Sequence, residues 1–327
     1  MTKVDIIVPV YNAFPFVEKC INSIEKHIDH WVKNIIIYDD CSSSETAKNL
    51  DAIKYGKVKV IHGETNLGYG GAVNAAFKHT SSDLVLVLNS DTEAYEDFVE
   101  PLIKIMLNRE QVAAVNPVYG IKYANKYKEY SCRDGYVKTY QLSGYAYLIR
   151  RVVFDQVGGF RKEFGRGYFE DHAIARDICS MGLETGLCVS SFLPHAVSQS
   201  FSSKQVSELL KRNEVIFDKL FPASKERILV VGDVTNETID RIEAVCRQGG
   251  KVFLYGGCGS YRKSDFSAHV KFLISFFEFT SLINRYIVRA GRNRKMITKI
   301  WLFGKGYMIS KKIAQHVSKK YKLPIVR

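Results

Sequence analysis

The chain of 327 residues is 46% hydrophobic and 12% aromatic, a composition that excludes an intrinsically disordered protein and favours two globular domains. It contains no apolar run near the ~20 residues that span a bilayer, and its N-terminus lacks the apolar core of a secretory signal, so we expect a cytoplasmic location. The seven scattered cysteines form no C-x-x-C pair, which argues against a disulfide framework and indicates reduced thiols rather than a zinc site.

The net charge of +13 is concentrated toward the C-terminal end of the sequence. Residues 251–327 contain 17 Lys or Arg but only Asp265 and Glu278 as acidic residues, so this part carries +15 and residues 1–250 carry −2. A near-neutral body and a basic end require separate explanations.

The first 120 residues alternate apolar, strand-like runs with amphipathic stretches. Strands are predicted at 4–10, 34–40, 57–63 and 83–91, and helices at 16–27, 44–53, 70–80 and 97–108. This alternation predicts an α/β fold with a mostly parallel sheet and helices on both of its faces. From about residue 112 to 222 the pattern loosens, through a segment rich in Tyr and Lys, as expected for an α+β extension of the same domain.

A second, smaller domain is predicted after a linker at 221–227. A strand at 227–233, a helix at 237–248 and a strand at 251–257 restart a β-α-β pattern, and the chain from about 268 onward is predicted to be helical and basic. We therefore expect one domain over residues 1–222 and a basic accessory domain over residues 223–327.

Acidic residues follow two of the predicted strands. Asp39 and Asp40 end the second strand, and Asn89-Ser90-Asp91 ends the fourth. Such residues can simply form turns or cap the next helix. They can also line a pocket, because the carboxyl ends of parallel strands meet at one edge of the sheet, where nucleotides and metals bind in α/β proteins.

Glycines mark two further turns. Gly68, Gly70 and Gly71 precede the third helix, and this number of glycines favours close approach of the backbone to a ligand. The first strand lacks the G-x-G-x-x-G of a dinucleotide site, and Gly256-Gly257-Cys258-Gly259 lacks the third glycine at the required offset, so neither position has the dinucleotide-binding pattern.

Seven segments together resemble the family 2 glycosyltransferases of GT-A fold, and they occur in the family's order over roughly the first 60% of the chain. The segments are IIVPVYNA, IYDDCSSS, NLGYGGAVNAAF, LNSDTE, LSGYAYLIRRVVFDQVGGF, GYFEDHAIARD and FLPHAVSQSF. The forms NLGYGG and LNSDTE are most similar to the branch that includes rhamnosyltransferases and other surface-polysaccharide enzymes. The resemblance implies an inverting transfer of a sugar from a UDP- or dTDP-sugar to a hydroxyl of a glycan or lipid-linked glycan.

The resemblance also assigns roles to residues. Asp40 is the expected base-binding carboxylate. Asp91 matches the last acidic residue of the family's D-x-D motif, which holds Mn or Mg, while Asn89 stands at the first position; His195 matches a histidine that completes the metal site in some members. Asp171 is the expected catalytic base. The residues implied to bind the donor nucleotide are Pro9, Tyr11, Asn12, Asp40, Asn66, Gly68, Gly71 and Asn89, and those implied to lie near the sugar or acceptor are Gly144 and Glu170.

Plainer interpretations remain open for these residues. Glu170 and Asp171 would also suit a helix N-terminus, and a histidine after Pro194 can be structural. Two rival functions are a nucleotidyltransferase, which would want a basic residue near the first strand, and a non-catalytic scaffold on the same fold, which the Asn89 departure would fit.

The basic C-terminal region lies outside the resemblance. Its apolar residues at helical spacing are Phe272, Leu273, Phe276, Phe277, Leu282, Ile283, Tyr286 and Ile287, interleaved with Arg285, Arg289, Arg292, Arg294 and Lys295. The pattern fits a packed helix with a solvated basic face, or a peripheral segment that docks on an anionic inner membrane leaflet. No recognised nucleic-acid module is present, so no nucleic-acid partner is expected.

Overall fold

The computed structural model describes residues 2–195, 203–257, 259–288, 296–304 and 306–326. The chain divides into two compact units, Met1–Phe217 (unit 1) and Asp218–Arg327 (unit 2). The division falls inside helix α8 (Ser203–Leu220), just before the linker expected at 221–227.

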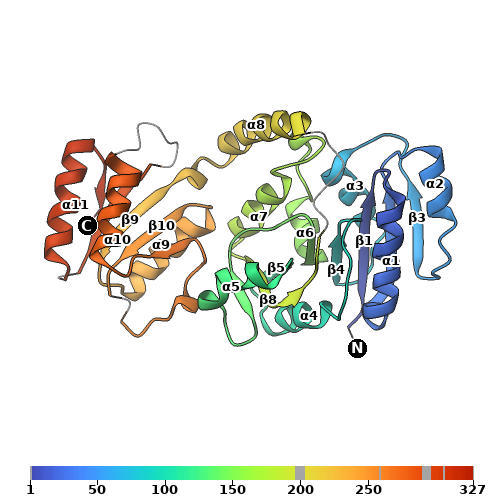
Figure 1. The fold of residues 1–327 in the computed structure, drawn as a ribbon, viewed down its shortest axis with the longest axis horizontal. Helices are drawn as coiled ribbons and strands as arrows, with labels where there is room; N and C mark the ends of the chain where they lie inside the picture. The colour runs from blue at the N-terminus through green and yellow to red at the C-terminus, as the bar shows by residue number, and fades with distance from the viewer. Residues whose placement is uncertain (1, 196–202, 258, 289–295, 305, 327) are drawn as a thin grey trace. The chain divides into compact units, whose positions relative to one another are not determined.

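Unit 1 is built on an eight-stranded sheet. Its strands are β1 (Val4–Val10), β2 (Val32–Asp39), β3 (Val58–His62), β4 (Leu84–Leu88), β5 (Val112–Val118), β6 (Tyr136–Lys138), β7 (Ala146–Arg150) and β8 (Glu184–Phe192). They lie in the order β3-β2-β1-β4-β7-β5-β8-β6, and β3, β1 and β4 follow one another inward from the outer edge of the unit in Figure 1. The first four are parallel, which confirms the predicted mostly parallel sheet.

Alternate residues of the central strands pack on opposite faces of this sheet. Ile6 and Val8 face a core formed with α1 and α4, whereas Ile7 faces a second core formed with α3, α6 and α7. A strand buried on both faces reads as a continuous apolar run, which is the pattern of residues 4–10. The helices of unit 1 are α1 (Phe14–Ile28), α2 (Ser44–Asp51), α3 (Gly68–Phe77), α4 (Val99–Asn108), α5 (Ile121–Tyr127), α6 (Arg151–Val157) and α7 (Glu170–Ser180).

Strand β7 runs against its neighbours. It pairs antiparallel with both β4 and β5. Its first residues, at the Gly144–Tyr145 end, therefore lie at the sheet edge where β1, β2 and β4 finish. This reversal brings a loop from the middle of the chain to the edge that carries Asp40 and Asp91.

Unit 2 contains a second parallel sheet of five strands in the order β11-β10-β9-β12-β13. The strands are β9 (Arg227–Gly232), β10 (Lys251–Tyr255), β11 (Val270–Phe272), β12 (Lys299–Phe303) and β13 (Ile325–Val326), and the helices are α9 (Asn236–Arg247), α10 (Phe276–Ile283) and α11 (Met308–Tyr321). Helices α10 and α11 share one apolar core with β9 and β12. Helix α9 lies on the other face, where the Arg241 guanidinium is 5.2 Å from the Trp301 ring.

The expectation of a purely helical region after about residue 268 is wrong. Three short strands, β11, β12 and β13, complete the sheet that β9 and β10 begin. Phe272 belongs to β11 rather than to a helix; among the described residues of this region α10 and α11 are α-helical, and Asn284–Val288 forms a π-helical turn. The two or three residues of β13 and β11 are too few to show a period of two. Cys258 and residues 289–295, with Arg289, Arg292, Arg294 and Lys295, lie outside the described residues.

Candidate active site

The turn after β1 is tied to the turn after β2 through Asn12. The Asn12 main-chain N–H donates to Ser42 Oγ (2.8 Å), and the Ser43 N–H donates to Asn12 Oδ1 (3.0 Å). Asn12 has φ 59°, a left-handed conformation that asparagine tolerates better than most residues. The Tyr11 side chain beside it is exposed and Pro9 is half-buried, so this turn presents an open ring next to a fixed backbone.

Asp40, predicted to bind a nucleotide base, is 3% exposed and holds the glycine-rich loop. Its Oδ1 accepts from the Leu67 N–H (2.7 Å) and its Oδ2 from the Gly68 N–H (2.9 Å). Burial raises the pKa of Asp40, and these two N–H donors oppose that shift. The neighbouring Asp39 is engaged by His62, whose Nδ1 lies 2.7 Å from Asp39 Oδ2, and this contact raises the pKa of His62.

The glycine-rich loop packs closely against the segment before α7. A Cβ on Gly68 would lie 2.5 Å from the Arg166 Cα, and Gly68 has φ +72°, so both the space and the backbone conformation require glycine there. A Cβ on Gly71 would meet the Leu67 side chain at 2.6 Å. Asn66 donates from Nδ2 to the Asp40 carbonyl oxygen at 3.3 Å. The three glycines, which were expected to precede the third helix, form the first turn of α3 and pack as one unit with Asp40.

The predicted metal ligands come together after two strands: Asp91 follows β4 and His195 follows β8, and an antiparallel bridge pairs Thr92 with His195. Nε2 of His195 lies 3.0 Å from Oδ1 of Asp91, but the ring is not aligned for a hydrogen bond along this contact, and Nε2 is buried with no hydrogen-bond partner among the described residues. Two donor atoms that face each other without bonding suit a shared cation, and a nitrogen–oxygen pair suits Mn²⁺ or a similar metal.

Other groups must complete any such coordination. Within the described ranges no cluster of three His, Cys, Asp or Glu residues forms. The Asn89 backbone is occupied, since its N–H donates to the Tyr145 carbonyl oxygen (2.8 Å) and its own carbonyl oxygen accepts from the Thr92 hydroxyl (2.8 Å). Residues 196–201 of the predicted motif around His195 lie outside the described residues.

Asp171, in the first turn of α7, is held by the loop that leads into β7. The Gly144 N–H donates to Asp171 Oδ2 at 3.0 Å, and the Asp171 Oδ1 accepts from the His172 N–H at 2.8 Å. A carboxylate at a helix N-terminus is stabilised by the unsatisfied N–H groups there, but Asp171 also remains partly exposed.

Two consecutive residues connect the predicted base to the predicted metal ligands. Gly144 binds Asp171, while Tyr145 binds Asn89 through its carbonyl oxygen and places its ring centroid 5.2 Å from that of His195. The structure thus brings Asp171, Asp91 and His195 to one region of the sheet edge. Asp40 is connected to the same region because it accepts the Gly68 N–H, and Gly68 packs against the backbone of Arg166 in the segment before α7.

Glu170 occupies a different environment from Asp171. Its side chain packs beside Gly70, is 7% exposed, and leaves Oε2 without a hydrogen-bond partner among the described residues. Burial, together with the adjacent Asp171, raises the pKa of Glu170 well above its ordinary range. Glu170 is therefore buried against Gly70 of α3, whereas Asp171 lines a cavity.

That cavity, of about 190 Å³, is lined by residues that the sequence did not single out. Besides Asp171 and His172 its walls are formed by Asn116, Pro117, Tyr119, Tyr123, Tyr127, Thr139, Gln141, Leu142, Ser143, Tyr145 and Leu187. The sequence signal that was available is the Tyr- and Lys-rich stretch around α5. Arg166 was missed as well; it is exposed, and its charge partly opposes the rise that burial causes in the pKa of Asp40.

Parts of the chain are similar in sequence to known proteins. The chain is 28% identical over 113 residues to the dolichol-phosphate mannosyltransferase of Pyrococcus furiosus, covering 34% of this chain and 32% of that protein. It is 31% identical over 94 residues to the poly(ribitol-phosphate) beta-N-acetylglucosaminyltransferase TarS of Staphylococcus aureus, covering 28% of this chain and 16% of TarS. The chain thus spans about a third or less of the length of these two relatives.

Two solved structures share the fold of unit 1. The mannosyltransferase PcManGT from Pyrobaculum calidifontis, in complex with GDP-Man and Mn²⁺, superposes with a TM-score of 0.51 at 20% identity, over 61% of this chain and 58% of that chain. GalNAc-T7 with UDP, GalNAc and Mn²⁺ gives a TM-score of 0.53 at 13% identity, over 68% and 50% of the two chains. The fold is therefore GT-A.

The family profile described as Glycosyl transferase family 2 matches residues 5–169, just over half of the chain. The match runs from β1 through the turns that carry Asp40, Gly68 and Asp91 to the residue before Glu170. The chain belongs to glycosyl transferase family 2.

Proposed function

We propose that the protein is an inverting, metal-dependent glycosyltransferase. It would move a sugar from a UDP- or dTDP-sugar to a hydroxyl of a glycan acceptor. The observation that carries the proposal is the Gly144–Tyr145 connection, which joins Asp171 to Asn89 and His195 at one sheet edge, where His195 lies 3.0 Å from Asp91. Family membership and the TarS likeness support a role in the synthesis of a bacterial surface polysaccharide.

Asp171 is the proposed general base. As the acceptor oxygen forms its bond to the anomeric carbon, the bond from that carbon to the diphosphate oxygen breaks, and the acceptor proton passes to the Asp171 carboxylate. The nucleoside diphosphate leaves with the bonding electron pair. A single base opposite the leaving group inverts the anomeric carbon, by the geometric logic of inverting glycosidases. The Gly144 N–H, 3.0 Å from Asp171 Oδ2, would fix the carboxylate's direction.

Asp91 and His195 are the proposed holders of a Mn or Mg ion, whose charge would stabilise the departing diphosphate. The unpartnered Nε2 of His195 beside the Asp91 carboxylate supports this assignment. The donor nucleotide is proposed to lie over Tyr11 and Asn12, against the loop that Asp40 organises. In this arrangement Asp40 would act mainly by shaping that loop, because both of its oxygens accept backbone N–H groups.

The test of the base is the Asp171→Asn variant. Asparagine keeps the shape and can still accept the Gly144 N–H, but it cannot accept a proton, so we expect transfer to fall about 10²–10⁴-fold while donor affinity is retained. Transfer would be followed with a panel of sugar nucleotides and Mn²⁺, and donor affinity by thermal stabilisation. Undiminished turnover of Asp171→Asn would refute the assignment.

The same assay separates the rival functions. A nucleotidyltransferase would leave the sugar nucleotides intact and would release pyrophosphate only when a nucleoside triphosphate and a sugar phosphate are supplied, whereas a non-catalytic scaffold would bind the donor and consume neither set of substrates. Product analysis by mass therefore distinguishes the three.

We further propose that unit 2 docks on an anionic membrane surface, where a lipid-linked glycan acceptor would be presented. The support is an apolar patch on unit 2 formed by Ile274, Phe276, Phe277, Met308 and Ile309, all exposed. Ring contacts from Phe276 to Phe279 (6.0 Å), from Phe279 to Tyr255 (4.7 Å) and from Tyr255 to Tyr307 (5.5 Å) connect the α10 part of the patch to the residue before Met308. An exposed apolar patch of this kind marks an interaction surface.

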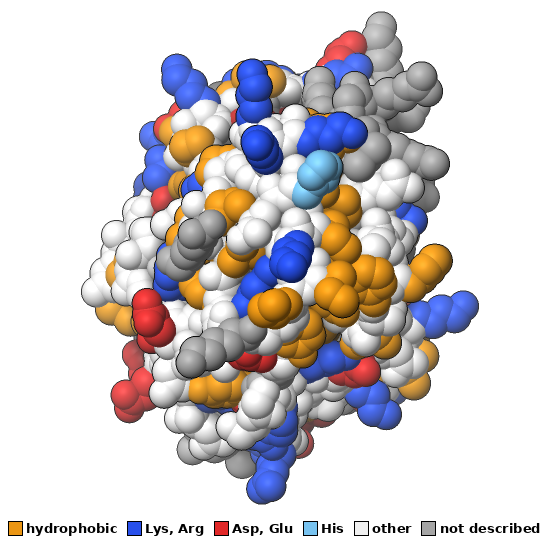
Figure 2. All heavy atoms as spheres, turned by 90° about the vertical axis from the view of Figure 1, so that its left-hand side faces the viewer, with side chains coloured by type: hydrophobic (Ala, Val, Ile, Leu, Met, Phe, Trp, Pro, Cys, Tyr) orange, Lys and Arg blue, Asp and Glu red, His pale blue; other side chains and the backbone are white. Residues whose placement is uncertain are grey.

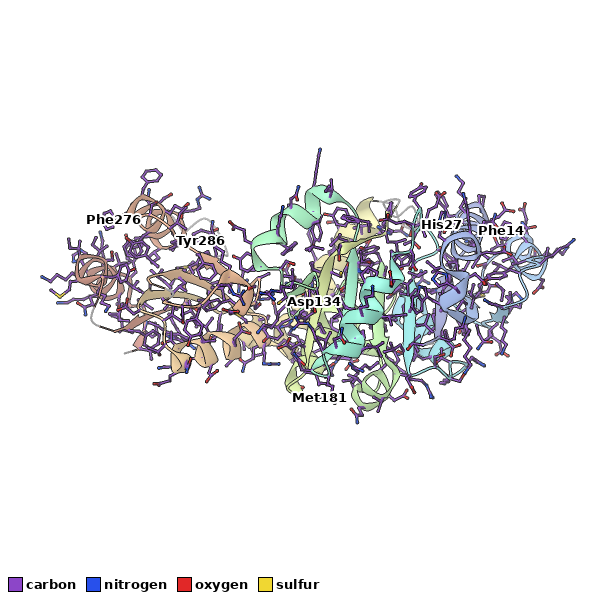
Figure 3. All side chains as sticks on the ribbon, turned by 90° about the horizontal axis from the view of Figure 1, so that it is seen from below. Phe14, His27, Asp134, Met181, Phe276 and Tyr286 are labelled. Atoms are coloured by element: carbon purple, nitrogen blue, oxygen red, sulfur yellow. The ribbon has the colours of Figure 1, made fainter. Side chains whose placement is uncertain are left out.

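Charge around the patch favours an anionic partner. Lys271 and Lys312 are exposed near its two ends, and Figure 2 shows Lys and Arg side chains among and around the hydrophobic ones on this face. Figure 3 places Phe276 and Tyr286 on the same side of the unit 2 sheet. Among the described residues no helix is both long enough and apolar enough to cross a bilayer.

A further inference from the structure

We propose that Tyr119, Tyr123 and Tyr127 form a stacking surface for the sugar rings of the acceptor glycan, at the mouth of the cavity that Asp171 lines. This inference rests on the proposed function, in which Asp171 is the base, and it adds the acceptor side of the site. The ligand class is a neutral glycan whose pyranose rings present a C–H face.

The three tyrosines form a continuous row. The ring centroids of Tyr119 and Tyr123 are 4.4 Å apart, and those of Tyr123 and Tyr127 are 5.1 Å apart. Their spacing of four residues puts Tyr123 and Tyr127 on one face of α5. Tyr127 donates its hydroxyl to that of Tyr123 at 3.4 Å, and the Lys126 ammonium lies 5.4 Å from the Tyr123 ring, so neighbours fix the direction of this ring.

The row continues toward the proposed metal site. Tyr145 lies edge-on to Tyr119 with centroids 6.5 Å apart, and its other neighbour is His195 at 5.2 Å. The Tyr145 hydroxyl donates to the Pro117 carbonyl oxygen at 2.8 Å, which anchors it. Tyr145 therefore stands between the cavity and the Asp91–His195 pair, so a sugar on the row would have one edge toward the reacting region.

Simple core packing does not account for Tyr119. Its side chain is 52% exposed, while Tyr123 and Tyr127 are only half-buried. A large aromatic ring that contributes to folding is normally buried, whereas exposed and ordered tyrosines are typical of recognition surfaces. All three rings line the same cavity of about 190 Å³.

The polar lining of the cavity matches a sugar. Gln141 and Ser143 are exposed lining residues, and Asp171 and His172 line the same cavity. A pyranose ring has an apolar C–H face and a rim of hydroxyl groups, so it needs a flat apolar surface on one side and polar groups around it. The cavity offers this combination, with the proposed base placed to meet one rim hydroxyl.

The test uses glycan binding without a donor, so that it does not depend on turnover. Saturation-transfer NMR would be recorded on the full chain with maltotetraose, cellotetraose and chitotetraose as probes. We expect transfer to the ring C–H protons of at least one of the three, weakened about two- to tenfold in affinity by Tyr119→Ala or Tyr123→Ala and retained by Tyr119→Phe. Tyr261→Ala, in unit 2, is the matched control.

Three results would overturn the inference: no transfer to any of these glycans, affinity unchanged in Tyr119→Ala and Tyr123→Ala, or equal loss in Tyr261→Ala. Circular dichroism of each variant would show that the fold is intact. Failure of the proposed function would instead appear as undiminished turnover in Asp171→Asn, so the two failures are distinguishable.

Discussion

Asp91, in the turn after β4, lies beside the imidazole of His195, to which it makes no hydrogen bond. If the pair holds a cation, Mn²⁺ should strengthen the binding of UDP or dTDP to the wild type, and Asp91→Ala should abolish that increase, because it removes the carboxylate ligand. Isothermal titration calorimetry with and without Mn²⁺ measures this difference.

Asp83, exposed just before the start of the same strand, provides the matched control. Asp83→Ala should retain the full effect of Mn²⁺ on nucleotide affinity. An equal Mn²⁺ effect in Asp91→Ala and the wild type would reject the metal assignment.

Glu170 predicts a pH dependence of stability. Because its pKa is raised in the folded state above the ordinary value of 4.5, the folded protein binds this proton more tightly than the unfolded chain. The free energy of unfolding therefore falls as pH rises above about 4.5 toward the raised pKa. Glu170→Gln cannot ionise, so its stability relative to the wild type should increase with pH between about 5 and 9.

Urea unfolding across that range measures the effect, with Glu163→Gln as the exposed control. Parallel pH curves for Glu170→Gln and the wild type would show that Glu170 does not titrate in this way.

The sequence assigned roles to Asp91, His195 and Asp171 because each matches a short motif of the family. It could not show that both oxygens of Asp40 accept N–H groups from Leu67 and Gly68, since these bonds depend on how a loop 27 residues away closes. The tyrosine row was missed for a similar reason: Tyr145 joins Tyr119 only after β7 is paired in the sheet.

At the scale of elements, α8 holds the segment that leads into α7. The fully buried Asn213 donates from Nδ2 to the carbonyl oxygens of Phe164 (2.8 Å) and Gly167 (2.7 Å). Asn213→Ala leaves these acceptors unpaired, so we expect a loss of about 1–3 kcal/mol of stability, or a few degrees in the unfolding midpoint. Thermal unfolding followed by circular dichroism measures the shift.

Val215→Ala, on the exposed face of the same helix, should leave the midpoint nearly unchanged. A shift for Asn213→Ala no larger than that of Val215→Ala would mean that α8 does not support this segment.

The predicted elements agree with the structure where the strands are long and buried on both faces. The strand expected at 4–10 is β1, and the strand expected at 34–40 overlaps β2 along most of its length. The antiparallel direction of β7 could not be predicted from the sequence, because strand direction depends on pairing partners that are distant in the sequence. The short strands β11 and β13 carry too few residues for their periodicity to be recognised.

At the scale of the whole molecule, the apolar patch predicts membrane binding by unit 2. Flotation with phosphatidylcholine vesicles, with and without phosphatidylglycerol, should show binding only to the anionic vesicles, weakened by salt because screening reduces the attraction of Lys and Arg. Phe277→Ser removes a side chain that is 78% exposed and should weaken binding severalfold.

Leu107→Ser, which changes an exposed apolar residue of unit 1, serves as the control. Equal binding to both vesicle types, or equal loss in the two variants, would contradict the assignment of the patch.

The reversed direction of β7 has a consequence for how specificity could diversify. Everything proposed for the donor nucleotide comes from residues 9–89, whereas the tyrosine row and the loop before β7 come from residues 119–145. Exchanging residues 119–145 between homologous enzymes would change which acceptor glycan is bound, and the nucleotide pocket would stay the same. Enzymes that form new linkages could then evolve by replacement of this one segment, while the residues that bind the nucleotide sugar stay unchanged.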